Sequence, residues 1–282
     1  MQQSNKALLL MLGSTICLTI MNLLIKLMPG VPAVELVFIR SVIGAIGAAF
    51  LLKYSKMSFV PNKPAYLILV TLTFMSSMLL YYYTLQKMTL GMALSLRYLF
   101  PFIVMIIAVL FLNEKVKIMQ WLSALLVIAG LVLFKGVSTD VALPIFFCGV
   151  AGAIFSALSY LFIKKASEFD HPLVILNFGF FLTVFILLPF AYQQWTPLNN
   201  SEIIYVTAMS VVAFFGSIMV IYALQMGEAS KVAPVKYVEV LAAFIIGFFF
   251  FNETFSSLSL CGVALIFTGL LANVYFQNNK ET

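Results

Sequence analysis

Ten apolar segments, each close to the length needed to cross a bilayer, limit what this chain can fold into. A helix needs about 20 apolar residues to span the hydrocarbon core, because its backbone polar groups must be satisfied within the segment. The sequence is 63% hydrophobic and only 9% charged, whereas about a quarter of the residues of a soluble domain are charged. The expected fold class is therefore an all-α integral membrane protein with ten transmembrane helices. The expected spans are 6–28, 33–52, 65–87, 91–112, 117–135, 142–163, 172–192, 202–225, 230–251 and 257–276.

The lysines between these segments predict the orientation of the chain, since cytoplasmic loops are enriched in Lys and Arg. With the N-terminus inside, three lysines lie outside: Lys26, Lys87 and Lys135. Ten lie inside: Lys6, Lys53, Lys56, Lys63, Lys115, Lys117, Lys164, Lys165, Lys231 and Lys280. We therefore expect a multi-pass protein of the cell (inner) membrane with both termini cytoplasmic. We also expect the first segment to be retained, because no small-residue cleavage site follows it.

The two halves of the chain resemble each other at an offset of 139 residues. Nine of the 32 residues in the window 83–114 are identical to their counterparts in 222–253, including Tyr98 with Tyr237. We divide the chain into a first five-helix repeat, residues 1–138, and a second, residues 139–282. Because each half has an odd number of spans, the second must be inverted in the membrane. Inverted repeats are common in secondary transporters, whose substrate site lies near the midplane between the halves.

Four features resemble the EamA-type drug/metabolite transporter superfamily. They are the five-helix repeat, Phe38-Ile39-Arg40, the Pro101-containing span that runs into Phe111-Leu112-Asn113-Glu114, and Gly130-Leu131. The resemblance covers nearly the whole chain and implies a ten-helix fold that moves small organic solutes. Such solutes would be amino acids, their derivatives or nucleoside-like metabolites. The short segment 233–239, with the sequence Ala-Pro-Val-Lys-Tyr-Val-Glu, further resembles the S-adenosylmethionine uptake members of that superfamily.

Charged residues inside the spans are candidates for substrate binding, because each costs at least about 2.5 kcal/mol at the bilayer centre. At about 1.5 Å per residue, Arg97 lies roughly 9 Å from the outer end of its span and Lys236 roughly 9 Å from the inner end. We interpret them as clamps for an anionic group on two branches of one cavity. Glu239, near the middle, would pair with Lys236 or with a cationic group of the substrate. The alternative is a Lys236–Glu239 pair within one helix, with Arg97 reaching toward the interface.

Further polar residues complete the candidate substrate-binding set. Tyr98 and Tyr237 lie deep in their spans and occupy equivalent positions in the repeats. Arg40 serves either helix packing or the site. In the run 81–83 we expect two of the three tyrosines to form an interfacial belt and one to face inward. The remaining candidates are Tyr83, for which the interfacial belt is the alternative role, and Tyr160, Asn22 and Asn177, for which it is interhelical hydrogen bonding.

Two acidic residues lie at span ends and repeat, but we do not expect them to bind substrate. Glu114 and Glu253 each follow an Asn, in the pattern of turn and capping residues. They are therefore interpreted as structural.

These residues favour a secondary transporter that moves a carboxylate-bearing or zwitterionic small molecule by alternating access. An exporter of amphipathic drugs or metabolites is one alternative, and an intramembrane enzyme or a channel is the alternative from another class. The sequence contains no phosphate-binding glycine loop, metal-ligand cluster or nucleophile–base pattern. We therefore expect no enzymatic activity, no cofactor, no metal and no nucleic-acid partner. The lipid bilayer is the expected surrounding, and Glu239 is a candidate for coupling transport to protons.

Overall fold

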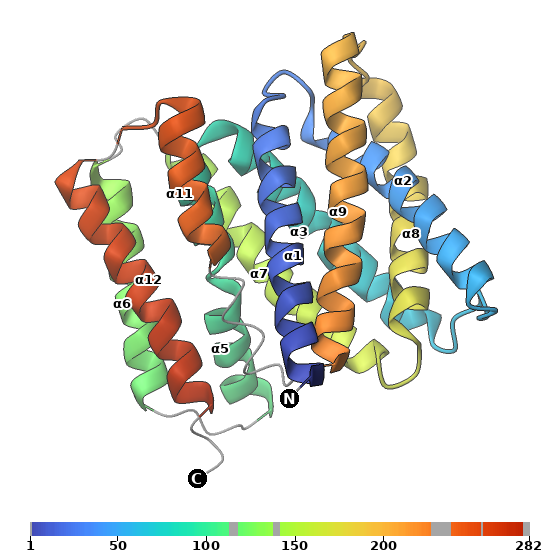
Figure 1. The fold of residues 1–282 in the computed structure, drawn as a ribbon, viewed down its shortest axis with the longest axis horizontal. Helices are drawn as coiled ribbons and strands as arrows, with labels where there is room; N and C mark the ends of the chain where they lie inside the picture. Colours follow the sequence, from blue (N-terminus) through green and yellow to red (C-terminus); the bar gives the residue numbers. More distant parts are fainter. Residues whose placement is uncertain (1, 113–117, 138–141, 227–237, 255, 279–282) are drawn as a thin grey trace.

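The computed structural model describes residues 2–112, 118–137, 142–226, 238–254 and 256–278, and all regular structure in these ranges is helical (Figure 1). Seven stretches among the described residues are long and apolar enough to cross a membrane. Three shorter apolar helices lie at residues 118–133, 238–251 and 257–272. Together they correspond to the ten expected spans, so the predicted all-α membrane fold is confirmed. The helices are α1 (Gln2–Lys26), α2 (Ala33–Tyr54), α3 (Pro64–Lys87), α4 (Leu90–Arg97), α5 (Phe100–Leu112), α6 (Ile118–Val137), α7 (Leu143–Ala166), α8 (Pro172–Gln194), α9 (Asn200–Met226), α11 (Val238–Phe251) and α12 (Ser257–Asn278).

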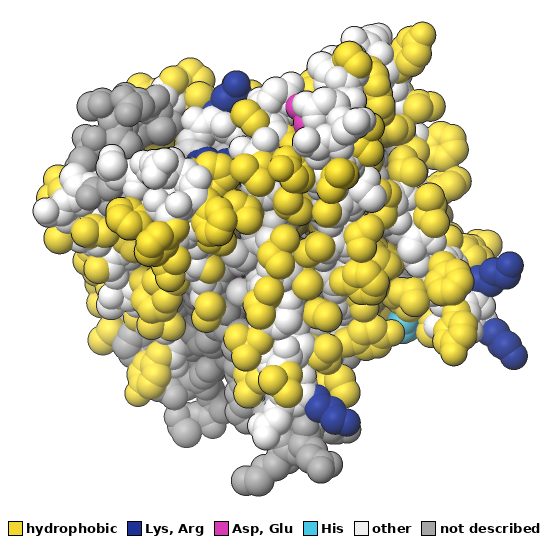
Figure 2. Space-filling model, turned by 45° about the horizontal axis from the view of Figure 1, so that its top comes forward, with side chains coloured by type: hydrophobic (Ala, Val, Ile, Leu, Met, Phe, Trp, Pro, Cys, Tyr) yellow, Lys and Arg dark blue, Asp and Glu magenta, His cyan; other side chains and the backbone are white. Residues whose placement is uncertain are grey.

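The surface of the bundle is mostly apolar. Figure 2 shows hydrophobic side chains over most of the visible face, with Lys and Arg mainly near its margins. Large side chains such as Phe50, Ile46 and Phe249 are 67–72% exposed. A soluble domain rarely exposes apolar patches of this extent, and lipid is the environment in which they are favourable.

Four helix pairs make the most extensive contacts: α6 with α12, α1 with α9, α3 with α7, and α2 with α8 (Figure 1). The first helix of each half thus packs against the third helix of the other half. The fifth helices of the two halves pair with each other, and so do the second helices. The division into two repeats stays a prediction.

The α6–α12 pair depends on two glycines. A Cβ on Gly130 would lie 2.6 Å from the carbonyl oxygen of Gly262, and one on Gly269 would lie 2.8 Å from that of Ser123. Only a residue without a side chain allows the two backbones to approach so closely. The two glycines are separated by the 139-residue offset found in the sequence.

The expected fourth span, 91–112, is broken into α4 and α5 at Tyr98 and Leu99. Pro101 explains the break, because it lacks an N–H group and its ring clashes with the carbonyl four residues earlier. Tyr98 caps the C-terminus of α4 with φ −75° and ψ 8°. The break matters for the site because it places Tyr98 between two helices. Of the expected ninth span, residues 230–237 lie outside the described residues, and α11 is described from Val238 onward.

Candidate substrate-binding site

Glu239 of α11 is buried between helices that are far apart in the sequence. Its side chain is 3% exposed. The carboxylate oxygen Oε1 accepts a hydrogen bond of 2.7 Å from Nδ2 of Asn22 on α1, and Oε2 accepts one of 2.8 Å from the hydroxyl of Tyr98. Hydrogen bonds to a charged group contribute about 1.5–3 kcal/mol each. Both carboxylate oxygens are therefore satisfied by neutral donors.

Tyr81 of α3 extends this network. Its hydroxyl donates to Oδ1 of Asn22 over 2.9 Å, so the amide of Asn22 accepts from Tyr81 and donates to Glu239. Asn22 is fully buried, and Tyr81 and Tyr98 are 4% and 6% exposed. We call these four residues the Glu239 cluster; they come from α1, α3, the α4–α5 break and α11.

The local sequence explains why Asn22 points inward. It lies one turn from the buried residues Leu18 and Ile25 on the apolar stripe of α1. A buried amide without hydrogen-bond partners would cost a few kcal/mol. Asn22 avoids this cost because Tyr81 and Glu239 complete its hydrogen bonds.

Arg97 contacts the cluster through Tyr81. Its guanidinium carbon lies 4.3 Å from the centre of the Tyr81 ring, a cation–π contact. Arg97 and Tyr81 also line a pocket with an empty volume of about 200 Å³ between α3, α4 and α7. Ser77 and Ser156 add hydroxyl groups to the wall of this pocket, and their two hydroxyl oxygens lie 2.5 Å apart. Tyr81 thus contacts a cation through its ring and a carboxylate network through its hydroxyl.

Arg97 and Glu239 attract each other electrostatically, but they do not form an ion pair. Among the described residues, the ion pairs are Lys26–Glu253 and Lys165–Glu168, and neither includes Arg97 or Glu239. A buried carboxylate and a guanidinium held apart in this way can each take a charged group of opposite sign.

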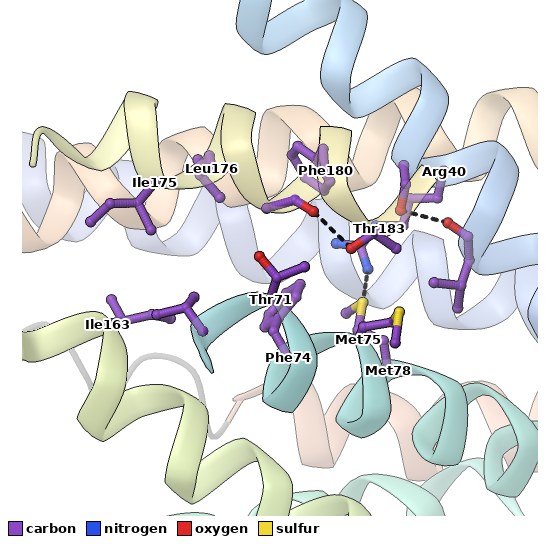
Figure 3. Close-up of a pocket in the computed structure, with 14 residues that line it drawn as sticks. Arg40, Thr71, Phe74, Met75, Met78, Ile163, Ile175, Leu176, Phe180 and Thr183 are labelled. Carbon is purple, nitrogen blue, oxygen red and sulfur yellow. Dashed lines mark hydrogen bonds between the residues drawn. The ribbon is translucent and has the colours of Figure 1, made fainter. Parts of the chain in front are cut away.

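Arg40 lies in a separate and larger pocket between α2, α3, α7 and α8 (Figure 3). Its Nη1 donates to the hydroxyl of Tyr82 over 2.9 Å and contacts the sulfur of Met78. The structure therefore places Arg40 near α3, but on a different face from the Glu239 cluster.

The expectation that two of the tyrosines 81–83 form an interfacial belt is wrong. Tyr81 and Tyr82 are buried, and only Tyr83 is 40% exposed. The reason is that α3 is covered on two adjacent faces: Tyr81 reaches Asn22 on α1, and Tyr82 reaches Arg40 on α2. A polar stripe at Ser77, Tyr81 and Thr84, with the spacing of one helix face, is the sequence signal that identifies Tyr81.

Three other candidates lie outside the Glu239 cluster. Tyr83 and Tyr160 are 40% and 50% exposed, and the centre of the Tyr160 ring lies 6.2 Å from that of Phe100. Asn177 is half-buried on α8. Lys236 and Tyr237 lie outside the described residues, so the Lys236–Glu239 pair stays a prediction.

Glu253, expected to be a turn and capping residue, also links distant helices. It forms an ion pair with Lys26 at the end of α1 and accepts a hydrogen bond of 3.1 Å from the backbone N–H of Leu90. Lys26 donates in addition to the carbonyl oxygen of Met88 over 2.8 Å. A Cβ on Gly247 would overlap the Glu253 carboxylate, so a larger residue there would force this side chain to shift. We call Lys26 and Glu253 the clasp. Glu114, the residue equivalent to Glu253 in the first repeat, lies outside the described residues.

The chain matches known transporters along nearly its whole length. A model of the EamA-like transporter family matches residues 5–135 and again residues 143–275. The chain is 24% identical over 257 residues to the pseudopaline exporter CntI of Pseudomonas aeruginosa, covering 90% of each protein. It is 25% identical over 231 residues to an S-adenosylmethionine uptake transporter of Rickettsia conorii, covering 81% of this chain and 78% of that protein.

Two further comparisons agree with these. An uncharacterized transporter of Helicobacter pylori is 28% identical over 205 residues, which is 69% of this chain and 68% of that protein. One crystal structure with 16% sequence identity superimposes with a TM-score of 0.70 and covers 99% of both chains. The fold described above is therefore shared with an experimentally determined structure.

Proposed function

Because the chain belongs to the EamA-like transporter family, we propose that it is a secondary transporter of small zwitterionic metabolites that works by alternating access. The relatives named above act on S-adenosylmethionine and on pseudopaline, one as an uptake transporter and one as an exporter. Amino acids and amino-acid derivatives such as S-adenosylmethionine are the solutes that this proposal favours, ahead of nucleosides.

The observation that carries the proposal is the arrangement of Arg97 and Glu239 around Tyr81. A zwitterion brings a carboxylate and an ammonium or sulfonium group, which are the complements of a guanidinium and a carboxylate. The Arg97 side would hold the substrate carboxylate, and Glu239 would hold the cationic group. Charges at this depth cost at least about 2.5 kcal/mol each, which favours a role in binding over a role in packing.

The arrangement of the helices supports alternating access. The contacts of α1 with α9 and of α3 with α7 are those that two inverted repeats related by a two-fold axis would make. The clasp holds α1, the loop before α4 and the end of α11 together at the end of the bundle that the lysine pattern predicts to be outside. We infer that the clasp closes this end and must open in the other state.

Transport into proteoliposomes tests the function. The assay compares labelled S-adenosylmethionine, a panel of amino acids and a nucleoside, each with and without the unlabelled solute trapped inside. Saturable uptake that internal solute accelerates is the expected result for at least one zwitterion. A channel would show neither behaviour, and their absence for every solute tested would overturn the proposal.

Two variants connect the transport to the site. Glu239→Gln keeps the shape of the side chain but removes its charge, so we expect transport to fall to the background of empty liposomes. Glu168→Gln is the matched control, because Glu168 is exposed and, in the described part of the chain, its ion pair is with the exposed Lys165. Undiminished transport by Glu239→Gln would refute the role of the carboxylate.

A further inference from the structure

The pocket around Arg40 is separate from the Glu239 cluster. It lies between α2, α3, α7 and α8 and encloses an empty space of about 520 Å³, part of which is open to solvent. Its walls are mainly apolar, with Phe74, Met75 and Phe180 among them (Figure 3). No residue of the Glu239 cluster lines it.

Arg40 is a buried cation without an acidic partner. Its side chain is 4% exposed, and none of the ion pairs among the described residues includes it. Nη1 contacts only neutral groups, the Tyr82 hydroxyl and the Met78 sulfur, and Nε is buried without a hydrogen-bond partner in the described part of the chain. A guanidinium offers five N–H donors, so this one retains unused capacity where a charge is costly to bury.

Three hydroxyl groups of the pocket already donate hydrogen bonds within their own helices. Ser41, Thr71 and Thr183 each donate to a carbonyl oxygen one turn earlier in their own helix, over 2.7 Å. Among the described residues that line the pocket, Arg40 is therefore the charged group and the one with free donors. A ligand that satisfies it has to bring an acceptor, and an anionic acceptor is the strongest choice.

The pocket is polarised along its length. Arg40, Met78 and Thr183 lie at one end, whereas Ile163 and Ile175 lie at the other (Figure 3). From this arrangement we propose that the pocket binds an organic anion with an apolar body. The anionic group, a carboxylate, sulfonate or phosphate, pairs with Arg40, and the apolar body lies along α8 toward Ile175. This proposal goes beyond the zwitterion site, because the described residues that line the pocket include no carboxylate for a cationic group.

Gly179 provides a way to block the pocket without touching Arg40. A Cβ added there would lie 3.8 Å from the Thr71 hydroxyl oxygen, which is an ordinary van der Waals contact. Gly179→Ala therefore fits, whereas the longer side chain of Gly179→Leu extends into the space that the apolar body would occupy. Ala and Leu both favour a helix more than Gly does, so α8 should form in both variants.

Direct binding of 2-naphthalenesulfonate tests the proposal. This probe is a permanent anion with a compact apolar body. It is measured by equilibrium dialysis against the full-length protein in phosphatidylcholine nanodiscs, with empty nanodiscs subtracted. Methanesulfonate lacks the apolar body, and 2-naphthylmethylammonium has the opposite charge. We expect the sulfonate with the naphthalene body to bind and the two others not to compete with it.

The variants then locate the binding. Arg40→Gln should weaken it by about tenfold or more, and Arg40→Lys should retain part of it. Gly179→Leu should also weaken it, and by more than Gly179→Ala does. Glu239→Gln should bind the probe like the original protein although it fails to transport zwitterions, which separates this proposal from the proposed function. No binding to the original protein, or equal binding to Arg40→Gln and Gly179→Leu, would overturn the site.

Two further measurements distinguish between a lipid and a transported solute as the natural anion. If anionic lipid occupies the pocket, nanodiscs with phosphatidylglycerol will lower the apparent affinity for the probe, and Arg40→Gln will remove that effect. If a transported solute occupies it, proteoliposomes loaded with unlabelled probe will accelerate uptake of labelled probe. Each result supports an anion site at Arg40, and they differ only in what fills it.

Discussion

Asn22 and Glu239 lie 217 positions apart in the sequence and share a buried hydrogen bond of 2.7 Å between α1 and α11. The bond joins the first span of the chain to its ninth span, and through Tyr81 it also reaches the third. Any movement that separates α1 from α11 has to break it. The Glu239 cluster is therefore both a candidate binding site and a connection between the halves that alternating access would move.

Asn22→Ala should destabilise the protein, because it leaves the Tyr81 hydroxyl and Oε1 of Glu239 buried without this partner. Each unsatisfied buried group costs about 1–3 kcal/mol. The measurement is the midpoint of thermal unfolding in detergent. Thr15→Ala is the control: Thr15 is also buried on α1, but it donates only to the carbonyl oxygen of Met11 in its own helix. Equal midpoints for the two variants would contradict the interhelical role of Asn22.

Arg97→Gln should weaken the binding of a zwitterion but not that of the same molecule without its carboxylate. The expected loss of affinity is about tenfold or more, since a charge-assisted bond to the carboxylate is removed. The comparison uses an amino acid found to be a substrate and the corresponding amine, as competitors of transport. If both compounds lose affinity equally, Arg97 acts through Tyr81 and the fold rather than on the carboxylate.

Gly130→Val should separate α6 from α12, because the added side chain would meet the backbone at Gly262. Overpacking of this kind costs about 1–3 kcal/mol or more. Gly30→Ala is the matched control, since a Cβ there meets nothing within 4 Å. Size-exclusion chromatography and thermal unfolding of both variants check this prediction. A normal profile for Gly130→Val would mean that the helices tolerate a wider separation than the structure indicates.

The spans are predictable from the sequence because they depend on local properties: segment length and polarity define a transmembrane helix. The depth of Glu239 in the membrane stays a prediction. The break at Tyr98 is also encoded locally, in Pro101. The sequence does not reveal which side chains meet in the centre of the bundle.

The partners of Glu239 depend on how helices pack in lipid, where no hydrophobic driving force selects one face over another. Asn22 was a candidate, but nothing in its local sequence connected it with Glu239. The interfacial belt expected for two of the tyrosines 81–83 is wrong for Tyr81 because a run of three tyrosines does not reveal which faces of α3 are covered. The clasp between Lys26 and Glu253 was missed for the same reason, since each residue alone resembles an ordinary helix end.

Opening of the clasp should be required for every transport cycle. In a background without native cysteines, Lys26→Cys and Glu253→Cys are combined and joined by a short, reducible, thiol-specific cross-linker. Because the two positions hold α1 and α11 together at the predicted outer end, the cross-linked protein should still bind substrate but lose transport, and a reductant should restore it. Each single cysteine variant treated with the same reagent controls for modification alone. Full transport by the cross-linked protein would show that this end of the bundle stays closed throughout the cycle, and the path for the solute would then have to bypass the clasp.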